Sequence, residues 1–340
     1  MSDFFLTPAT RSAQRLQWAR DVCGDSSLQL ESASADASAR SYWRPQLREQ
    51  QYLVMDSPPA TEPLDQWLAM RAHLAAAGVR VPAVFDVDRN HGFALLEDLG
   101  PATLLSVLTK DSADRWFKAA LAQLIRLQSA PIPTDIDHFD ASQLERDASL
   151  FSDWFLQHHL QLHLSRAVIN ALGDVQSHLA DCLDHQPSVL VHRDFMPRNL
   201  IPLDADVAVI DFQDCLRGPI SYDPISLFKD TQISWPLSAI ERWLTKYYHL
   251  AQEAGFLHLP LPQFLQDADW MGIQRHLKVL GIFARLHHRD GKSHYLAEIP
   301  RIVHYLIEIL PRYPLFAPLY TFLLNDVLPA LAQQQGHRSI

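Results

Sequence analysis

Three polar side chains follow short apolar runs at spacings that suit the transfer of a phosphoryl group. His192-Arg193-Asp194 leads to Asn199, and Asp211 comes twelve residues later, directly after the apolar run Val207–Ile210. Phosphoryl transfer requires an acidic group beside the attacking hydroxyl and hard oxygen ligands that hold magnesium on the phosphates. The pattern H-R-D-x-x-x-x-N followed by D-F therefore predicts Asp194 as the catalytic base and Asn199 and Asp211 as Mg²⁺ ligands, with ATP as the donor.

Two predicted strands would bring the metal ligands together. Leu200-Ile201 and Val207–Ile210 flank a turn at Asp204–Asp206, so they are expected to pair antiparallel. Asn199 and Asp211 would then lie at the same end of the pair.

Two further residues are expected to support this loop. His192 begins the motif, and Asp223 lies in Gly218–Pro224, where a carboxylate would cap a helix or brace the catalytic loop. We assign both to structural support, and Asp223 is not expected to bind the metal.

The first hundred residues are predicted to be rich in strands. Predicted helices and strands there comprise a helix at 10–23, strands at 28–33, 41–44 and 51–55, a helix at 64–77, and a hairpin of 83–87 with 93–96. Beyond Pro101 the sequence predicts helices, apart from a strand pair near residues 188–212. We therefore predict an α+β fold with a nucleotide-binding lobe at 1–100, a hinge at Glu97–Gly100, and a helical lobe at 101–340.

The hinge and one loop are the predicted nucleotide contacts. Glu97 and Leu99 would contact adenine through their backbone groups, and Ser38 lies in a loop of small residues that could approach the phosphates. The third predicted strand carries no lysine for the phosphates, and Asp56 stands near that place. A triphosphate cannot be desolvated without a cation, so Arg40 and Arg44 are the candidates; the alternative is a pair of exposed charges on an edge strand.

The segment Gln274–Leu286 predicts an amphipathic helix with Arg275, Lys278 and Arg285 on one face. Two interpretations are open: a solvated basic stripe, or cations that meet a substrate carboxylate or a phosphate. The side chains predicted to contact the substrate are Arg198, Asp214, Arg275, Lys278 and Arg285.

Composition excludes several classes of protein. The 340 residues are 48% hydrophobic and 20% charged with a net charge of −10, which fits a globular protein and argues against a nucleic-acid partner. Three scattered cysteines favour a reducing compartment, and neither a leader peptide nor an apolar stretch of membrane-spanning length is predicted. We expect a cytoplasmic protein with a small-molecule substrate. His159 and His163 have the i, i+4 spacing of a zinc pair, but we interpret them as a surface pair.

The motifs together resemble the aminoglycoside phosphotransferase superfamily, whose members share a two-lobed fold similar to protein kinases. Phe212-Gln213-Asp214 lacks the glycine of a protein-kinase D-F-G, which favours the small-molecule enzymes. Within the superfamily, several segments resemble the bacterial anomeric N-acetylmuramate/N-acetylglucosamine kinases of cell-wall recycling. These segments are 36–44, 54–59, 96–100, 192–199, 210–214, 274–286 and 289–292. The resemblance implies an α-1-phosphate product.

Two alternatives stay open from the sequence. The acceptor could be an aminoglycoside or choline, although a cationic substrate would favour an acidic pocket over the basic Arg275 helix. The chain could also be a catalytically silent nucleotide-binding protein, since the lysine is missing. Retention of Asp194, Asn199 and Asp211 argues against that alternative.

Overall fold

The computed structural model describes residues 8–34, 39–46 and 52–338. The chain forms two compact units. The first contains the residues up to Ala130 together with Pro197–Asp214, and the second contains Pro131–Met196 together with the residues from Cys215 onward. Each unit is described by itself below.

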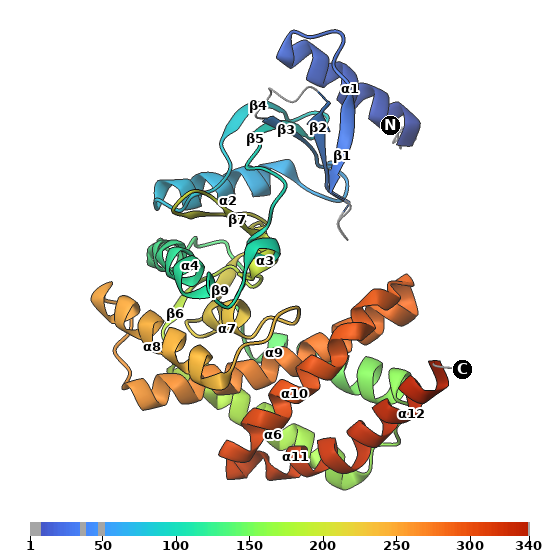
Figure 1. Ribbon diagram of the computed structural model, residues 1–340, viewed down its shortest axis with the longest axis vertical. Helices are drawn as coiled ribbons and strands as arrows, with labels where there is room; N and C mark the ends of the chain where they lie inside the picture. The colour runs from blue at the N-terminus through green and yellow to red at the C-terminus, as the bar shows by residue number, and fades with distance from the viewer. Residues whose placement is uncertain (1–7, 35–38, 47–51, 339–340) are drawn as a thin grey trace. The chain divides into compact units, whose positions relative to one another are not determined.

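The described residues of the first unit form an antiparallel sheet, four α-helices, one short 3-10 helix and a small strand pair (Figure 1). Its elements are α1 (Pro8–Cys23), β1 (Leu30–Ser34), β2 (Ser41–Pro45), β3 (Tyr52–Asp56), α2 (Leu64–Ala76), β4 (Val84–Asp88), β5 (Phe93–Glu97), α3 (Leu104–Val107), α4 (Ala113–Ser129), η2 (Pro197–Asn199), β7 (Leu200–Pro202) and β8 (Val207–Val209).

The five-stranded sheet has the order β1-β2-β3-β5-β4. Helix α1 covers one face, where Ala19 packs on Val54 and Leu95 in a buried cluster. The register places Tyr42 opposite Met55, so strand β2 lies inside the sheet. Because side chains alternate along a strand, the opposite face of β2 and β3 is left for other contacts.

Helix α2 ends where its sequence predicts. Gly78 follows the last turn with φ +79°, a left-handed conformation that glycine adopts without steric cost. Strands β7 and β8 pair antiparallel, with Leu200 opposite Val209. This confirms the predicted strand pair beside the two predicted metal ligands.

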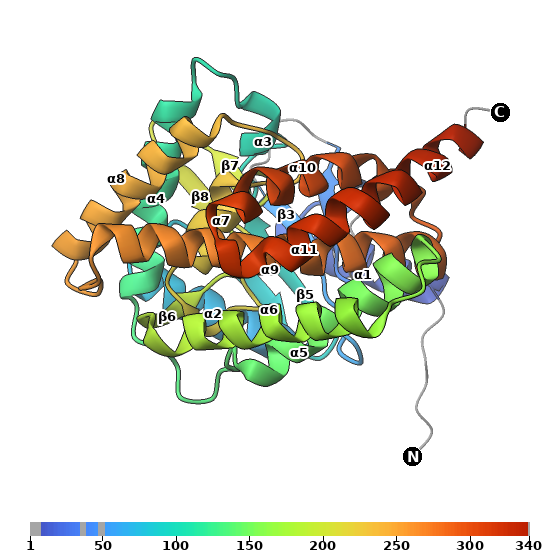
Figure 2. The ribbon, with the colours of Figure 1, turned by 90° about the horizontal axis from the view of Figure 1, so that it is seen from below.

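The second unit is mostly helical (Figure 2). Its elements are α5 (Ala141–Ser149), η1 (Leu150–His159), α6 (Arg166–His185), β6 (Ser188–Val191), β9 (Leu216–Pro219), α7 (Tyr222–Phe228), α8 (Leu237–Glu253), α9 (Leu261–Asp290), η3 (Ser293–Glu298), α10 (Ile299–Ile309), η4 (Leu310–Arg312), η5 (Pro314–Phe316), α11 (Ala317–Phe322), η6 (Leu323–Val327) and α12 (Leu328–Arg338).

Helix α9 is the central element of this unit and contacts α5, η1, α6, α7, α8 and α10. It approaches η1 closely at Gly281, where an added Cβ would lie 2.3 Å from the Leu150 carbonyl oxygen. The helix ends at Gly291, whose φ is +69°. Most residues from Asp267 to Ala284 are buried, so the middle of α9 is enclosed on all sides.

The observed elements confirm the α+β fold class, with a β-rich N-terminal part and a mainly helical remainder. One strand pairing differs from expectation, because Val189–Val191 pairs with β9, which the sequence analysis did not predict. The prediction about apolar stretches also needs correction. The helical run Pro314–Gln334 is long and apolar enough to cross a membrane by length and composition, with a mean hydropathy of 1.4. A core helix passes the same test, so this is weak evidence of a span.

Candidate active site

A cavity of about 280 Å³ lies within the first unit, beside the predicted hinge. Its walls come from both strand systems of the unit and from the chain between β5 and α3. The lining residues are Ala33, Tyr42, Arg44, Leu53, Trp67, Pro82, Leu96, Glu97, Asp98, Leu99, Gly100, Pro101, Thr103, Arg198, Asn199, Ile201, Ile210, Asp211 and Phe212. The structure thus brings the hinge and both predicted metal ligands to one cavity.

Glu97 is held firmly at the hinge. Its carboxylate pairs with the Arg80 guanidinium and accepts the Ala83 N–H at 3.0 Å. The hydrogen bond from Arg80 lowers the pKa of Glu97. The Glu97 N–H donates to the Ala83 carbonyl at 2.9 Å, so of its two backbone groups only the carbonyl is suited to contact a nucleotide.

Arg44 stabilises the next part of the hinge. It donates two hydrogen bonds to Asp98, at 2.6 and 2.9 Å, and one to the Gly100 carbonyl at 3.1 Å. Burial alone would raise the pKa of Asp98, but the bonds from Arg44 and the Gly100 N–H outweigh it and lower that pKa. The interpretation of Arg44 as an exposed edge-strand charge is therefore wrong, since β2 is an inner strand and Arg44 is half-buried.

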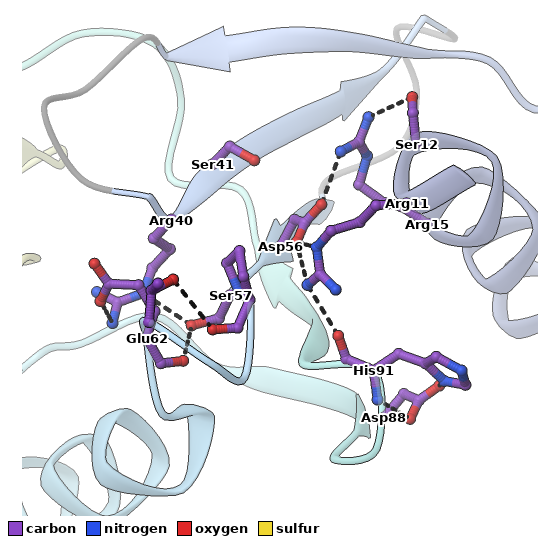
Figure 3. Close-up of polar contacts among 12 residues, drawn as sticks. Arg11, Ser12, Arg15, Arg40, Ser41, Asp56, Ser57, Glu62, Asp88 and His91 are labelled. Atoms are coloured by element: carbon purple, nitrogen blue, oxygen red, sulfur yellow. Dashed lines mark hydrogen bonds and ion pairs between the residues drawn. The ribbon is translucent and has the colours of Figure 1, made fainter. Parts of the chain in front are cut away.

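Arg40 is buried as well, with 5% of its surface exposed. Figure 3 shows its guanidinium beside Glu62 and Ser57, with Nη2 at 2.9 Å from Glu62 Oε2 and Nε at 3.3 Å from Ser57 Oγ. Arg40 directly precedes β2, and the two-residue alternation of that strand, extended by one residue, places Arg40 on the same face as Tyr42 and Arg44, which both line the cavity. The edge-strand interpretation is wrong here too.

Asp56 faces the other side of the sheet. Figure 3 shows it between Arg11 and Arg15 of α1, which donate to it at 2.8 Å each. Asp56 therefore does not stand in the place of the missing lysine. Since Leu53 lines the cavity, alternation assigns the corresponding position to Met55, which is fully buried.

Asn199 and Asp211 are in contact at the end of β7 and β8. Asn199 Nδ2 donates to Asp211 Oδ2 at 3.3 Å, and Gln213 Nε2 donates to Asp211 Oδ1 at 2.9 Å. Asp211 has φ +64°, a left-handed conformation that costs a non-glycine residue about 1–3 kcal/mol and is typical of functional sites. The Asp211 carboxylate and the Asn199 amide, both in the cavity wall, carry hard oxygen atoms of the kind that Mg²⁺ prefers.

The residues after Asp211 give the cavity an aromatic wall that the sequence analysis did not assign. Phe212 is fully buried and packs against Trp67 of α2, with ring centroids 5.2 Å apart. Both rings line the cavity. The D-F motif pointed to Phe212, but no local pattern identified Trp67, because its contact depends on the packing of α2.

The predicted catalytic loop lies in the second unit and is braced by Asp223. This carboxylate accepts the N–H groups of His192 at 2.8 Å and of Arg193 at 3.1 Å. Burial raises the pKa of Asp223 to about 7, against the opposite effect of those two hydrogen bonds. Arg193 has φ +74°, so the residue before Asp194 is held in a strained conformation.

Arg275 of α9 lies against the same loop. Its side chain is 5% exposed and its guanidinium is 3.8 Å from the Asp194 carboxylate, whose side chain is 46% exposed. Arg275 also donates to the Arg193 carbonyl at 3.1 Å. Burial alone would lower the pKa of Arg275, but the nearby Tyr222 and Asp194 outweigh it and raise that pKa.

The interpretation of the basic residues on α9 as a solvated stripe is therefore wrong for Arg275 and Lys278. Lys278 is also buried and donates to the Tyr222 hydroxyl at 2.6 Å. Arg285, which follows Lys278 by seven residues on the same helix, is half-buried. The alternation of basic and apolar residues did not predict this burial, because neighbouring elements enclose the middle of α9 on all sides.

The remaining predicted site residues are placed as follows. Arg198 is exposed and lines the cavity with the hinge residues, whereas Asp214 is exposed and outside the cavity wall that the described residues form. Ser38 lies outside the described residues. His159 is 5% exposed and contacts His288 at 3.1 Å, so its interpretation as a surface residue is wrong.

Comparisons with known proteins identify the family to which the chain belongs. Residues 29–259 match the model of the phosphotransferase enzyme family, and the chain belongs to that family. It is 41% identical over 85% of its length, and 86% of the relative's, to a protein of Pseudomonas putida named N-acetylmuramate/N-acetylglucosamine kinase. A Neisseria meningitidis protein of the same name is 36% identical over 93% of this chain and 96% of its own.

Solved structures show the same fold at low sequence identity. A Plasmodium vivax ethanolamine kinase matches with a TM-score of 0.62 at 12% identity and covers 89% of this chain and 90% of its own. An ADP-bound aminoglycoside phosphotransferase matches with a TM-score of 0.59 at 15% identity, over 86% of this chain and 97% of its own. The protein is thus a phosphotransferase with the fold of the small-molecule kinases.

Proposed function

We propose that this protein uses ATP and Mg²⁺ to phosphorylate the anomeric hydroxyl of N-acetylmuramate or N-acetylglucosamine. The observation that carries the proposal is the 41% identity over most of the chain to relatives named for these two sugars. We further propose that the enzyme acts in the cytoplasm, in the recycling of cell-wall sugars. Its three cysteines are free thiols, which supports a reducing compartment.

Adenine would occupy the cavity at the hinge. The Glu97 carbonyl would accept a hydrogen bond from the base and the Leu99 N–H would donate one, while Arg44 and Asp98 keep the hinge in shape. Leu53 and Leu96 supply apolar surface in the same wall, so a flat aromatic base fits the lining.

Asn199 and Asp211 are the residues that would hold Mg²⁺. When bound, the ion would neutralise charge on the phosphate oxygens. The contact between the two side chains and the positive φ of Asp211 support this assignment, because a strained residue persists where its surroundings require that geometry.

Arg40, paired with Glu62, would supply the cation that the third strand lacks. The register places Arg44 near the hinge end of the sheet and Ser41 opposite Asp56 at the other end. Four residues of strand separate Arg40 from Arg44 by about 13 Å, a distance comparable to the reach of an extended triphosphate from its base. Arg198, in the cavity wall near the metal ligands, is a second phosphate contact.

Asp194 would accept the proton of the sugar hydroxyl, and its exposed carboxylate is open to an incoming substrate. Arg275 would orient Asp194 through their contact, so replacing Arg275 should lower turnover with both sugars. A cation that binds the lactyl carboxylate should instead affect only muramate. Lys278 lies one turn from Arg275, whereas the Cα of Arg285 is about 15 Å along the helix, so Lys278 is the better candidate for that contact.

The test is phosphorus NMR of the product formed from each sugar, followed by a reducing-end assay. A 1-phosphate blocks ring opening, so the product should lose its reducing end, which a 6-phosphate would retain. Turnover confined to aminoglycosides or choline, or a product that still reduces, would refute the sugar assignment. The absence of ATP turnover with every acceptor would favour a catalytically silent protein.

A further inference from the structure

A second cluster of chemically reactive side chains lies in the helical unit, where the end of α6 meets the start of α9. Figure 2 shows the two helices side by side, and they are in contact. Cys182 and His185 are one helical turn apart on α6, and Asp267 lies on α9. Cys182 Sγ, His185 Nε2 and a carboxylate oxygen of Asp267 all lie within 4.8 Å of one another.

The Asp267 carboxylate is poorly satisfied for a group that is 1% exposed. Its Oδ1 accepts from His185 at 2.9 Å, from Gln263 at 2.9 Å and from the Cys182 thiol at 3.7 Å. Its Oδ2 is buried and has no hydrogen-bond partner among the described residues. A buried carboxylate with an empty acceptor is costly unless a cation or water meets it.

We propose that Cys182, His185 and Asp267 bind a divalent transition-metal ion, with zinc the preferred ion. The fourth position would be taken by the Gln263 side-chain oxygen or a water molecule. The thiol proton of Cys182 passes to solvent when the metal binds, and the ion then balances one thiolate and one carboxylate.

Two of the three distances between the ligand atoms can be compared with those of a tetrahedral zinc site. Ordinary zinc bond lengths at a tetrahedral angle place neighbouring ligand atoms about 3.3 to 3.7 Å apart, with the pairs that include sulfur at the upper end. The Asp267–Cys182 distance of 3.7 Å lies at the upper end of this range, and the Asp267–His185 distance of 2.9 Å lies below it. Small side-chain rotations would therefore admit an ion.

The donor set selects the class of metal. Thiolate and imidazole ligands suit zinc and related ions, whereas Mg²⁺ and Ca²⁺ require oxygen donors. Gln186 donates to Cys182 Sγ at 3.0 Å, a hydrogen bond to the sulfur of the kind that orients metal ligands. His185 is 42% exposed, so the ion has a route in from solvent.

The metal would join two helices that matter to the active site. Asp267 precedes Arg275 by eight residues on α9, and Arg275 contacts the catalytic loop. Two ligands from α6 and one or two from α9 would fix the helices against each other. The inference concerns a structural ion and does not depend on which substrate is phosphorylated.

The test uses the full-length chain freed of metal with a chelator and then titrated with Co²⁺, which reports thiolate ligation by a charge-transfer band in the near ultraviolet. We expect one Co²⁺ per chain, displacement by one Zn²⁺, and a rise in Tm of about 5 °C with excess zinc. Cys182→Ser should abolish the band, while Cys215→Ser, which removes another buried thiol, should retain it.

His185→Gln guards against misfolding of the buried Cys182 variant, because this side chain is partly exposed. It should keep the far-ultraviolet circular dichroism of the parent and bind Co²⁺ at least about 10-fold more weakly. A band that survives Cys182→Ser, or no stoichiometric binding of Co²⁺ or Zn²⁺ to the parent chain, would overturn the proposal. In the latter case the cluster is a hydrogen-bonded group in which the thiol stays protonated.

Discussion

Replacing Arg40 with methionine should weaken ATP binding far more than it weakens the fold. Arg40 directly precedes β2 and is buried beside Glu62, and the alternation of β2 places it on the face that carries the cavity residues Tyr42 and Arg44. A hydrogen bond between charged groups contributes about 1.5–3 kcal/mol, so losing one to phosphate should weaken Mg²⁺–ATP binding by about 10- to 150-fold. Glu62 is 23% exposed, so water can hydrate much of its carboxylate when Arg40 is removed. The free energy of unfolding should therefore fall by only about 1–2 kcal/mol.

Arg15 provides a matched control on the opposite face of the same sheet. It is similarly buried, pairs with Asp56 at 2.8 Å, and lies over the Trp43 ring at 3.6 Å. Arg15→Met leaves a buried carboxylate with one fewer partner, so the fold should lose about 2–3 kcal/mol. ATP affinity should not change, because α1 lies on the face away from the cavity.

Calorimetry with ATP, ADP and adenosine, together with denaturant unfolding, measures both effects. If Arg40 meets the phosphates, Arg40→Met should reduce ATP affinity most and adenosine affinity least. Arg40→Lys should recover only part of the loss, since an ammonium cannot make the forked contact of a guanidinium. The reasoning is refuted if ATP and adenosine weaken equally, or if Arg15→Met reduces ATP affinity as much as Arg40→Met.

Three further predictions concern the catalytic loop, the metal ligands and the core. Asp194→Asn should lower turnover by about 100-fold or more with little change in ATP affinity; turnover assays that find most activity retained would remove it as the base. Asp211→Ala should abolish Mg²⁺-dependent ATP binding more severely than Asn199→Ala, because only a carboxylate neutralises charge; equal, small losses by calorimetry with and without Mg²⁺ would indicate another metal site. Burial lowers the pKa of His276 to about 3. Below about pH 6.5 this histidine therefore binds a proton in the unfolded chain but stays neutral in the folded chain. Stability should fall by about 2 kcal/mol between pH 6.5 and 5 on this account; denaturant unfolding should show a shallower fall for His276→Gln, and an unchanged slope relative to the exposed control His258→Gln would contradict it.

The sequence predicted the fold class and most elements of the first hundred residues. Local periodicity and glycine positions predict helix α2, its end at Gly78 and the β4–β5 hairpin. These signals lie within short segments of the sequence. The pairing of β6 with β9 was missed, since 24 residues separate Val191 from Leu216 and no local pattern links them. The predicted division of the lobes at Gly100 stays a prediction.

The sequence also predicted the residues of the cavity wall that lie next to one another in a motif. Glu97 and Leu99 are two residues apart, and Asn199 and Asp211 are joined by a tight strand pair, so short-range geometry brings them together. Trp67 was missed because its position depends on how α2 packs.

What the sequence determined by itself is the set of groups that the chain can offer: a candidate base, two candidate oxygen ligands and a predicted hinge, each within a short motif. The tertiary structure decided which charges face that chemistry. Successive side chains along a strand point to opposite faces of the sheet. The position of each charge within the sheet therefore decides that Asp56 faces α1, whereas Arg40 lies on the opposite face beside Glu62. The surroundings of α9 likewise buried Arg275 and Lys278, because the burial of a charge depends on what packs around its helix and not on the spacing of residues along it.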